Sequence, residues 1–344
     1  MSRTLLVTGG AGFIGTNFVR YWMENYPEDR VVVLDALTYA GNPANMEELR
    51  SDSRFRFYPG RIEDVTVVEG IFRWERITHV LNFAAESHND RSLMDPTGLI
   101  ASNVTGVSIL LEATRKYGAE RMLHVSTDEV YGEIESGLFK ETDPLEPRTP
   151  YSAGKAGGEL QVRAHQIAYG TKALVTRGSN TFGPFQFPEK ILPFFITRAM
   201  QDKKLPLYGD GKQVRDWIFV RDHCSGIATA LLKGEIGQVY NVGGGNERPN
   251  IEVTKMVLDA LGKPETLIKR IPDPRGASHD KRYALNTEKI EKLGWKPSAS
   301  FEEALGNTVK WYVDHRSWWE DIVNSTRYQQ FVKAFYGPYL GEDL

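Results

Sequence analysis

The chain has 344 residues, with 42 lysines and arginines against 45 aspartates and glutamates, and a formal net charge of -3. This balance argues against nucleic acid and anionic membranes as partners, although a local Arg/Lys pocket would still suit a small anionic ligand. The single cysteine, Cys224, excludes an intrachain disulfide framework and a cysteine-rich metal site, and no apolar run approaches the roughly 20 residues of a membrane span.

Short apolar runs alternate with helix-length segments through the first half of the chain. The first run follows Met1-Ser2-Arg3 directly, without the apolar stretch of a signal peptide, so we expect a soluble, cytoplasmic protein. Strands separated by helices predict right-handed βαβ units, and hence an α/β fold with a doubly wound, parallel, Rossmann-type sheet. The predicted strands are Thr4–Val7, Arg30–Leu34, Arg54–Tyr58, His79–Phe83, Arg121–Val125 and Lys172–Thr176.

The composition changes near Gly183, where proline, aromatic and charged residues become frequent. We therefore expect a Rossmann-type domain over residues 1–182 and a smaller C-terminal domain over residues 183–344 that binds mainly substrate. Two strand-like runs, Trp217–Val220 and Gln238–Val242, lie in a segment near 216–243 that we expect to return to the first sheet. The tail with Trp318 and Trp319 is typical of a surface helix and its docking site.

A glycine cluster, "TLLVTGGAGFIG", stands between the first predicted strand and a helix. The spacing Gly10-x-Gly12-x-x-Gly15, or Gly9-x-x-Gly12-x-x-Gly15, matches a dinucleotide-binding turn, although such a pattern alone also fits an ordinary tight turn. Asp35 ends the second predicted strand about 20 residues after Gly15, where an acid accepts hydrogen bonds from ribose hydroxyls and repels a 2′-phosphate. Together these residues predict NAD, rather than NADP, bound by residues 1–182.

Two adjacent carboxylates, Asp128 and Glu129, follow the predicted strand that leads into "HVSTDEVYG". Burial of paired acids is costly, so a chemical role is the simplest reason for their position. On a regular strand their side chains would point to opposite faces. We therefore expect the chain to leave strand geometry at Asp128, so that both acids reach one site.

A tyrosine and a lysine, Tyr151 and Lys155, are spaced to share one face of a helix in "YSAGK". Free tyrosine has a pKa of about 10 and is a poor base near neutrality. A neighbouring ammonium, helped by an oxidised nicotinamide, makes the phenolate accessible. The motif alone is equally typical of a surface helix; its combination with the glycine turn and with the Ser126-Thr127 hydroxyls favours an active site.

These motifs together resemble the extended short-chain dehydrogenase/reductase superfamily and, within its sugar-nucleotide branch, the dTDP-glucose 4,6-dehydratases. The resemblance runs nearly end to end, through "TGGAGFIG", "LDALTYAGN", "NFAAESHNDRS", "VSTDEVYG", "YSAGK", "SNTFGPFQFPEK", "LPLYGDGKQVRDW", "YNVGGGNERPNIEV" and "HDKRYALN". Thr127-Asp128-Glu129 is the most discriminating part, because related epimerases carry neutral residues there, and GDP-mannose dehydratases and UDP-glucuronate decarboxylases carry Thr-Ser-Glu.

The resemblance implies conversion of dTDP-glucose to dTDP-4-keto-6-deoxyglucose and water by transient hydride transfer to bound NAD. It implies that Tyr151 takes the proton of the C4 hydroxyl while the C4 hydride passes to NAD. Glu129, as a carboxylate, would then remove the C5 proton, and Asp128, as a neutral acid, would protonate the departing C6 hydroxyl. Crowded carboxylates cannot easily both ionise, which suits this division.

The resemblance also implies residue roles by position, including Tyr39 and Asn42 near the adenosine end. The implied catalytic residues are Thr127, Asp128, Glu129, Tyr151 and Lys155. The implied cofactor-binding residues are Gly9, Gly12, Phe13, Ile14, Gly15, Asp35, Leu37, Thr38, Ile62, Ala84, Ala85, Asn103, Tyr151, Lys155 and Asn180. The implied substrate-binding residues are Ser87, His88, Thr127, Asn180, Lys190, Ile191, Pro206, Tyr208, Arg215, Asn250, Arg275 and His279; no metal is implied.

The chain departs from the family pattern at several positions. Arg61 stands where the family usually has Asp, Asn89 replaces an aliphatic residue, Gly154 replaces Ser, and Gly178 replaces Cys. The spacing between Arg275 and His279 is one residue longer than in the family. These changes leave the catalytic groups in place and bear on nucleotide or sugar preference.

Two other functions compete with the dehydratase. One is another NAD-dependent sugar-nucleotide dehydratase, epimerase or decarboxylase, against which the acid pair argues. The other is a non-catalytic dinucleotide-sensing protein, which would need neither the acids nor Tyr151 and Lys155. The family is commonly dimeric through a helix pair, and we expect a homodimer; Val107, Ile109, Leu110 and Leu111 suit either the pairing face or the core.

Overall fold

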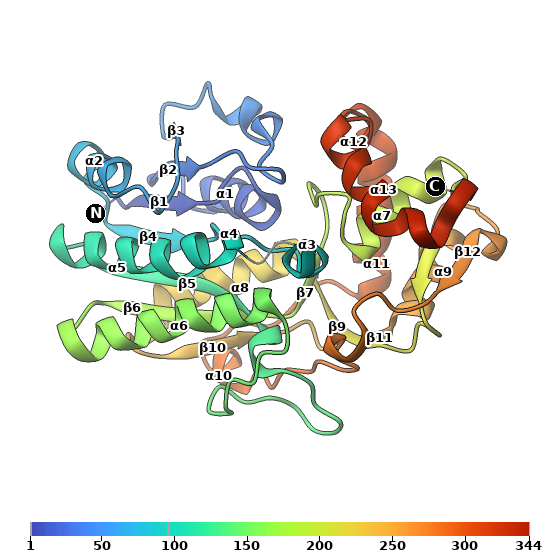
Figure 1. Cartoon of the computed structure of the whole chain (residues 1–344). Helices are drawn as coiled ribbons and strands as arrows, with labels where there is room; N and C mark the ends of the chain where they lie inside the picture. Colours follow the sequence, from blue (N-terminus) through green and yellow to red (C-terminus); the bar gives the residue numbers. More distant parts are fainter. Residues whose placement is uncertain (1, 95–96, 344) are drawn as a thin grey trace.

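A seven-stranded parallel sheet forms the centre of the computed structural model, which describes residues 2–94 and 97–343 (Figure 1). Its strand order is β10-β6-β5-β4-β1-β2-β3. The strands are β1 (Thr4–Thr8), β2 (Arg30–Asp35), β3 (Phe55–Pro59), β4 (His79–Asn82), β5 (Arg121–Thr127), β6 (Ala173–Gly178) and β10 (Val239–Val242). The chain builds outward from β1 on one side and then crosses to β4 on the other, so the predicted doubly wound, Rossmann-type sheet is confirmed.

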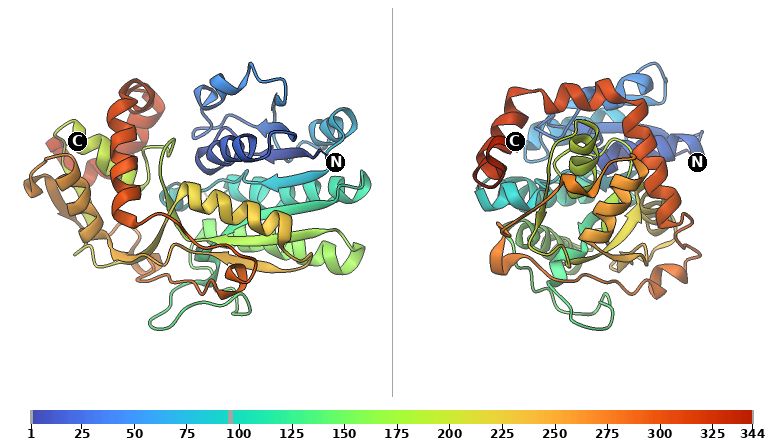
Figure 2. Two further views of the ribbon diagram at one scale, coloured as in Figure 1. Left: turned by 180° about the vertical axis from the view of Figure 1, so that it is seen from behind. Right: turned by 90° about the vertical axis from the view of Figure 1, so that its right-hand side faces the viewer.

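Helices cover both faces of this sheet, and alternate strand residues contribute to two separate cores. The helices are α1 (Phe13–Asn25), α2 (Val65–Glu75), α3 (Asn89–Met94), α4 (Thr97–Ile100), α5 (Val107–Lys116), α6 (Pro150–Tyr169), α8 (Val220–Lys233) and α10 (Glu288–Glu291). Figure 2 shows helices on both faces of the sheet. Leu5 and Val7 pack on the side of α1 and α8, whereas Leu6 packs on the side of α2, α5 and α6. Burial on both faces explains why these strands read as continuous apolar runs.

The α5 residues suggested for subunit pairing lie in the interior. Val107, Leu110 and Leu111 are fully buried in the core beneath α5, and Ile109 packs against it. Of the two roles expected for these residues, the structure therefore shows the core.

A second lobe, with its own apolar clusters, stands beside the carboxyl ends of the sheet (Figure 1). It contains a three-stranded sheet in the order β11-β9-β7 and a two-stranded sheet of β12 and β8. These strands are β7 (Asn180–Phe182), β8 (Leu205–Tyr208), β9 (Val214–Phe219), β11 (Glu247–Pro249) and β12 (Ile268–Ile271). The helices are α7 (Ile191–Met200), α9 (Asn250–Ala260), α11 (Phe301–Asp314), α12 (Arg316–Val323) and α13 (Thr326–Leu340).

Short helical turns complete the described chain. The 3-10 turns are Pro43–Leu49, Asp128–Tyr131, Glu265–Leu267, Gly276–Ser278 and Gly341–Asp343, and a π-helical turn spans Ala101–Gly106. None of the helices described is long and apolar enough to cross a membrane.

The strand expected at Trp217–Val220 does not return to the large sheet. Trp217 and Phe219 belong to β9, which pairs with β7 and β11, and Val220 begins α8. The edge of the large sheet beside β6 is occupied by β10, so the return is made by α8 packing on the face and by β10 at the edge.

The tryptophan-rich tail forms α12, as expected, and docks through both tryptophans. Trp319 is fully buried and its indole N–H donates to the Tyr312 carbonyl. The Trp318 indole N–H donates to the Asn45 side chain, 2.8 Å away, and so ties α12 to the 3-10 turn Pro43–Leu49.

Candidate active site

A cavity of about 370 Å³ lies at the carboxyl ends of the parallel strands and extends to the second lobe. It includes residues that follow β1 and β4, which flank the point where the strand order reverses. Open α/β sheets bind ligands at such switch points because the loops there diverge and leave a crevice.

The glycine turn after β1 fits a close approach of phosphate to the backbone. A Cβ atom on Gly15 would stand 2.2 Å from the Gly9 carbonyl oxygen, so only glycine permits this turn. α1 begins just after Gly12, the N-cap residue, which provides no side-chain cap. The backbone N–H groups and the helix dipole therefore remain directed at the cavity, as pyrophosphate binding requires.

Asp35 ends β2 at the edge of the cavity, with its carboxylate held in place by the backbone. One oxygen accepts from the Ala11 N–H at 2.9 Å and the other from the Leu37 N–H at 2.8 Å. Burial raises the pKa of Asp35, and these two hydrogen bonds oppose the shift. Each oxygen keeps a second lone pair, which suits the ribose hydroxyls of a dinucleotide.

The other residues predicted for the cofactor fall into two groups. Those that line the cavity are Gly9, Gly12, Phe13, Ile14, Gly15, Thr38, Ile62, Ala84, Ala85, Tyr151, Lys155 and Asn180. Leu37 and Asn103 do not line it. Leu37 contacts Asp35 through its backbone, and Asn103 holds the turn after β4 by donating to the Glu86 carbonyl and accepting from the Glu86 N–H. Tyr39 and Asn42 line a separate pocket of about 290 Å³.

The acid pair lies where β5 ends. The strand stops at Thr127, and the 3-10 turn Asp128–Tyr131 begins at the next residue, so the predicted departure from strand geometry at Asp128 is confirmed. The Thr127 hydroxyl oxygen caps this turn by accepting from the Glu129 N–H at 3.3 Å. Both acids consequently line the same cavity.

The two acids differ in their surroundings. Asp128 is 2% exposed, and its Oδ2 atom has no hydrogen-bond partner within the described residues. Burial, and then the charge of Glu129, raise the pKa of Asp128 well above its ordinary value. Glu129 is only half-buried. Burial and the neighbouring carboxyl group therefore favour a neutral Asp128.

Tyr151 and Lys155 project from the first turns of α6, which Thr149 caps and Pro150 begins. The Lys155 ammonium donates to the Val125 carbonyl at 2.7 Å, and burial lowers the pKa of Lys155 to about 8. Burial and the charge of Glu129 raise the pKa of Tyr151, while a hydrogen bond with the Thr127 side chain opposes them. The protein alone therefore keeps the phenol neutral.

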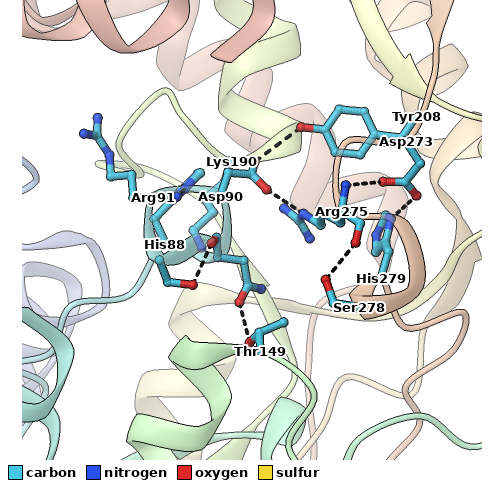
Figure 3. Close-up of polar contacts among 12 residues, drawn as sticks. His88, Asp90, Arg91, Thr149, Lys190, Tyr208, Asp273, Arg275, Ser278 and His279 are labelled. Carbon is cyan, nitrogen blue, oxygen red and sulfur yellow. Dashed lines mark hydrogen bonds and ion pairs between the residues drawn. The ribbon is translucent and has the colours of Figure 1, made fainter. Parts of the chain in front are cut away.

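The far end of the cavity is lined by cations and their partners (Figure 3). The Arg275 Nε atom donates to Asp90 at 2.6 Å, and the Tyr208 hydroxyl donates to the other Asp90 oxygen at 3.3 Å. Burial favours a higher pKa for Asp90, but Arg275 outweighs it and brings that pKa to about 2. His279 contacts Asp273 through Nδ1 at 2.6 Å.

Further polar groups converge on the same end. The Lys190 ammonium donates to the Ser87 carbonyl at 2.8 Å, and burial lowers the pKa of Lys190. Arg215 stacks on Tyr283, with 4.5 Å between the guanidinium carbon and the ring centroid. The side-chain oxygens of Asn180 and Asn250 are buried without a partner in the described part of the chain. Ser87, His88, Ile191 and Pro206 complete the predicted substrate residues that line the cavity.

Structural reasons emerge for some of the departures from the family pattern. A Cβ atom on Gly178 would stand 2.5 Å from the His223 ring, so that histidine occupies the space a cysteine would need. Arg61 pairs with Glu63 at 3.0 Å and its side chain is 56% exposed. The longer spacing after Arg275 is taken up by the 3-10 turn Gly276–Ser278, and both Arg275 and His279 still line the cavity.

Several cavity residues escaped the sequence analysis. Asp90, Trp217, His223 and Tyr283 all line the cavity. Asp90 had a local signal, since it lies two residues after the predicted His88. Trp217, His223 and Tyr283 reach the cavity only through the packing of the second lobe, which no local pattern indicates. Within residues 2–94 and 97–343, no group of three His, Cys, Asp or Glu side chains is placed to hold a metal ion.

Comparison with known proteins identifies the family of the chain. A family model described as "GDP-mannose 4,6 dehydratase" matches residues 6–308. The dTDP-glucose 4,6-dehydratase of Xanthomonas campestris pv. campestris (strain B100) is 46% identical over 344 residues, covering 94% of this chain and 97% of that protein. The dTDP-glucose 4,6-dehydratase of Actinoplanes sp. (strain SE50/110) is 44% identical over 322 residues, covering 92% of this chain and 99% of that protein.

A solved structure shows the same architecture. The dTDP-glucose 4,6-dehydratase DesIV from Streptomyces venezuelae, solved with NAD and TYD bound, matches with a TM-score of 0.90 and 45% identity, covering 93% of this chain and 99% of that one. The family match spans most of the chain, and the relatives exceed 40% identity over nearly their whole length. The chain therefore belongs to the GDP-mannose 4,6 dehydratase family, the sugar-nucleotide dehydratases of the extended short-chain dehydrogenase/reductase superfamily.

Proposed function

We propose that the protein converts dTDP-glucose to dTDP-4-keto-6-deoxyglucose and water, with NAD as its cofactor. The observation that carries this proposal is the acid pair: a buried Asp128 and a half-buried Glu129 face one cavity with Tyr151 and Lys155. GDP-mannose dehydratases carry Ser in place of Asp128, so the pair favours the dTDP-glucose reaction over that one. The relatives named above support the same substrate.

The site fits NAD at each point where a dinucleotide needs the protein. The Gly9–Gly15 turn and the start of α1 would hold the pyrophosphate, and Asp35 would accept from the ribose hydroxyls. The chemistry that bound NAD would supply there is reversible hydride transfer, away from C4 of the sugar and back to C6. Asp35 also repels a 2′-phosphate, which excludes NADP.

The protein residues divide the proton transfers between them. Tyr151 takes the proton of the C4 hydroxyl, for which it must first become a phenolate. Lys155 remains an ammonium below about pH 8, and its positive charge, together with that of the oxidised nicotinamide, favours that phenolate. Oxidation at C4 acidifies the neighbouring C5–H, which Glu129 removes as a base. Asp128, held neutral by burial, gives its proton to the departing C6 hydroxyl.

The cations at the far end of the cavity suit a nucleoside diphosphate. Arg215 and Arg275 offer forked N–H donors, and Lys190 offers a point charge. Asn180 and Asn250 offer side-chain oxygens that have no partner among the described residues. The remaining substrate residues predicted from sequence, Ser87, His88, Ile191, Pro206, Tyr208 and His279, belong to this end of the cavity in our proposal.

Mass spectrometry tests the proposal. The protein, supplied with NAD, is incubated in deuterated water with dTDP-glucose and, separately, with the corresponding UDP-, CDP- and GDP-hexoses. We expect dTDP-glucose to lose one water and to gain one deuterium at C5, with slower conversion of the other nucleotides. Bound NAD without turnover of any sugar nucleotide would instead favour a dinucleotide sensor, and epimerised product without water loss would favour an epimerase.

We also propose a homodimer that forms through the exposed side of α6. Three large apolar side chains lie on the outside of this helix: Leu160, Ile167 and Tyr169 are 57%, 75% and 60% exposed. Light scattering of Leu160→Glu/Ile167→Glu protein should give a monomer, whereas Trp74→Glu, on α2, should leave the dimer intact. A dimer in both variants would contradict this pairing.

The buried, unpaired Cys224 is typical of a reducing compartment, and we place the protein in the cytoplasm.

A further inference from the structure

Asn89, one of the departures from the family pattern, contacts the proposed base directly. Its Nδ2 atom donates to Oε2 of Glu129 at 2.7 Å. Its Oδ1 atom accepts from the Thr149 hydroxyl at 3.0 Å. Asn89 is 6% exposed and lines the cavity, so both hydrogen bonds are shielded from solvent.

The chemistry of its partners fixes which way the amide faces. A carboxylate oxygen can only accept, so it needs the NH₂ group of Asn89 and not its carbonyl. The Thr149 hydroxyl oxygen already accepts from the Ser152 N–H at 3.1 Å, which leaves its proton for Asn89. A reversed amide would set two oxygens 2.7 Å apart at Glu129.

This contact lies among groups that compete for the protons and charge of the site. Burial is the main cause that raises the pKa values of four neighbouring groups, Asp128, Tyr151, Asp280 and Tyr283, and the charge of Glu129 raises them further. The negative charge of Glu129 also favours the protonated forms of Lys190 and Arg275. None of these six groups is seen to donate to Oε2 of Glu129 in the described structure. Asn89 makes that hydrogen bond instead.

The same contact also fixes the base relative to Tyr151. Thr149 is the N-cap of α6, and Tyr151 lies two residues farther along that helix. The series Thr149, Asn89 and Glu129 therefore links the helix that carries Tyr151 to the carboxylate that follows β5. Tyr151 would act on the C4 hydroxyl and Glu129 on the neighbouring carbon, so both side chains must reach adjacent positions of one sugar ring.

We propose that Asn89 is a positioning residue that holds Glu129 as an oriented carboxylate, so that the proton shared by the acid pair resides on Asp128. The inference rests on the proposed function and adds to it a residue at which this chain departs from the family pattern, since the aliphatic side chain usual in the family can make neither hydrogen bond. Oε1 of Glu129 is left to face the C5 proton.

The test separates C4 oxidation from C5 proton removal in single turnovers with NAD and dTDP-glucose. NADH absorbance reports the first step, and deuterium uptake at C5 in deuterated water reports the second. Asn89→Leu removes both hydrogen bonds at similar volume, and Asn89→Asp replaces the donor by an acceptor but keeps the bond to Thr149. Ser92→Ala is the matched control, because it removes only the bond from Ser92 to the Asn89 backbone carbonyl.

We expect Asn89→Leu to slow deuterium uptake at C5 by about tenfold to a hundredfold, the loss typical of a hydrogen bond to a charged group, while NADH forms within about twofold of the wild-type rate. Asn89→Asp should lose more at C5, and Ser92→Ala should match the wild type. A wild-type rate of deuterium uptake at C5 in either Asn89 variant overturns this inference and leaves the proposed function in place. Wild-type protein that forms no NADH with dTDP-glucose overturns the proposed function, and this inference with it.

Discussion

At the scale of single residues, Asp128 and Glu129 show how neighbours in sequence acquire opposite roles. Asp128 is almost fully buried, and one of its oxygens has no partner in the described part of the chain, whereas Glu129 is half-buried and accepts from Asn89. A buried carboxyl prefers its neutral form, and a hydrogen-bonded carboxylate prefers its charged form. In our proposal, Asp128 is therefore the acid and Glu129 the base, although both side chains carry the same carboxyl group.

Asp35 gives the first prediction. Asp35→Ala removes the carboxylate that we expect to meet the ribose hydroxyls, and it should weaken NAD binding by roughly 1.5–3 kcal/mol. Without the negative charge, NADP should bind more nearly as well as NAD. Isothermal titration with both dinucleotides measures this, with Asp52→Ala as a surface-carboxylate control. Unchanged affinity for NAD would move the ribose contact to another residue.

At the scale of elements, the sequence predicts what local pattern controls. The apolar runs located the six strands of the Rossmann-type half to within a few residues, and the argument that two acids must share one face located the end of β5 at Thr127. The run Trp217–Val220 was misplaced, because a β-rich run does not say which sheet it joins. Because β10 pairs with the free edge of β6, the run Trp217–Val220 cannot pair there, and its β9 residues pair with β7 instead.

The packing of β6 against α8 gives the second prediction. Gly178 ends β6 and lies against the His223 ring of α8, where a Cβ atom would stand 2.5 Å away. Gly178→Cys should therefore destabilise the protein by about 1–3 kcal/mol, the usual cost of overpacking. Urea denaturation measures the loss. Adding His223→Ala should recover most of it, and a double variant no more stable than Gly178→Cys would contradict this account.

At the scale of the whole molecule, the site depends on two lobes that the sequence does not place relative to each other. The glycine turn, Asp35 and the acid pair come from the large sheet, whereas Arg215, Asn250 and Arg275 come from the second lobe. The resemblance to a known family named most of these residues. Local patterns could not have found His223, whose contact with Gly178 forms only when distant segments pack.

The ion pair between Asp90 and Arg275 gives the third prediction. The folded protein lowers the pKa of Asp90 from 3.8 to about 2, so the pair stabilises the fold above about pH 4. That contribution is lost as the pH falls toward 2. Asp90→Asn should therefore lower the free energy of unfolding by about 2–5 kcal/mol at pH 7, because Arg275 loses its partner.

Denaturant titrations of wild type and Asp90→Asn between pH 7 and pH 2 measure this difference directly. The gap between the two proteins should narrow as the pH falls from about 4 to about 2. Asp52→Ala, which removes a half-buried partner of Arg54, should show a smaller gap at pH 7. A gap for Asp90→Asn that does not change with pH would show that the ionised form of Asp90 is not what links the lobes.

The central claim, that one acid of the pair removes the C5 proton and the other releases water, is tested most directly by NADH absorbance and C5 deuterium uptake in two variants. With dTDP-glucose, Glu129→Gln and Asp128→Asn should both form NADH, because Tyr151 still serves the C4 hydroxyl, while Tyr151→Phe should form none. Glu129→Gln should take up no deuterium at C5, and Asp128→Asn should lose water about 10²–10⁴-fold more slowly than the wild type. Their effects should not be additive, because the pair is coupled. An Asp128→Asn protein that dehydrates at the wild-type rate, or one that cannot form NADH, would contradict the claim.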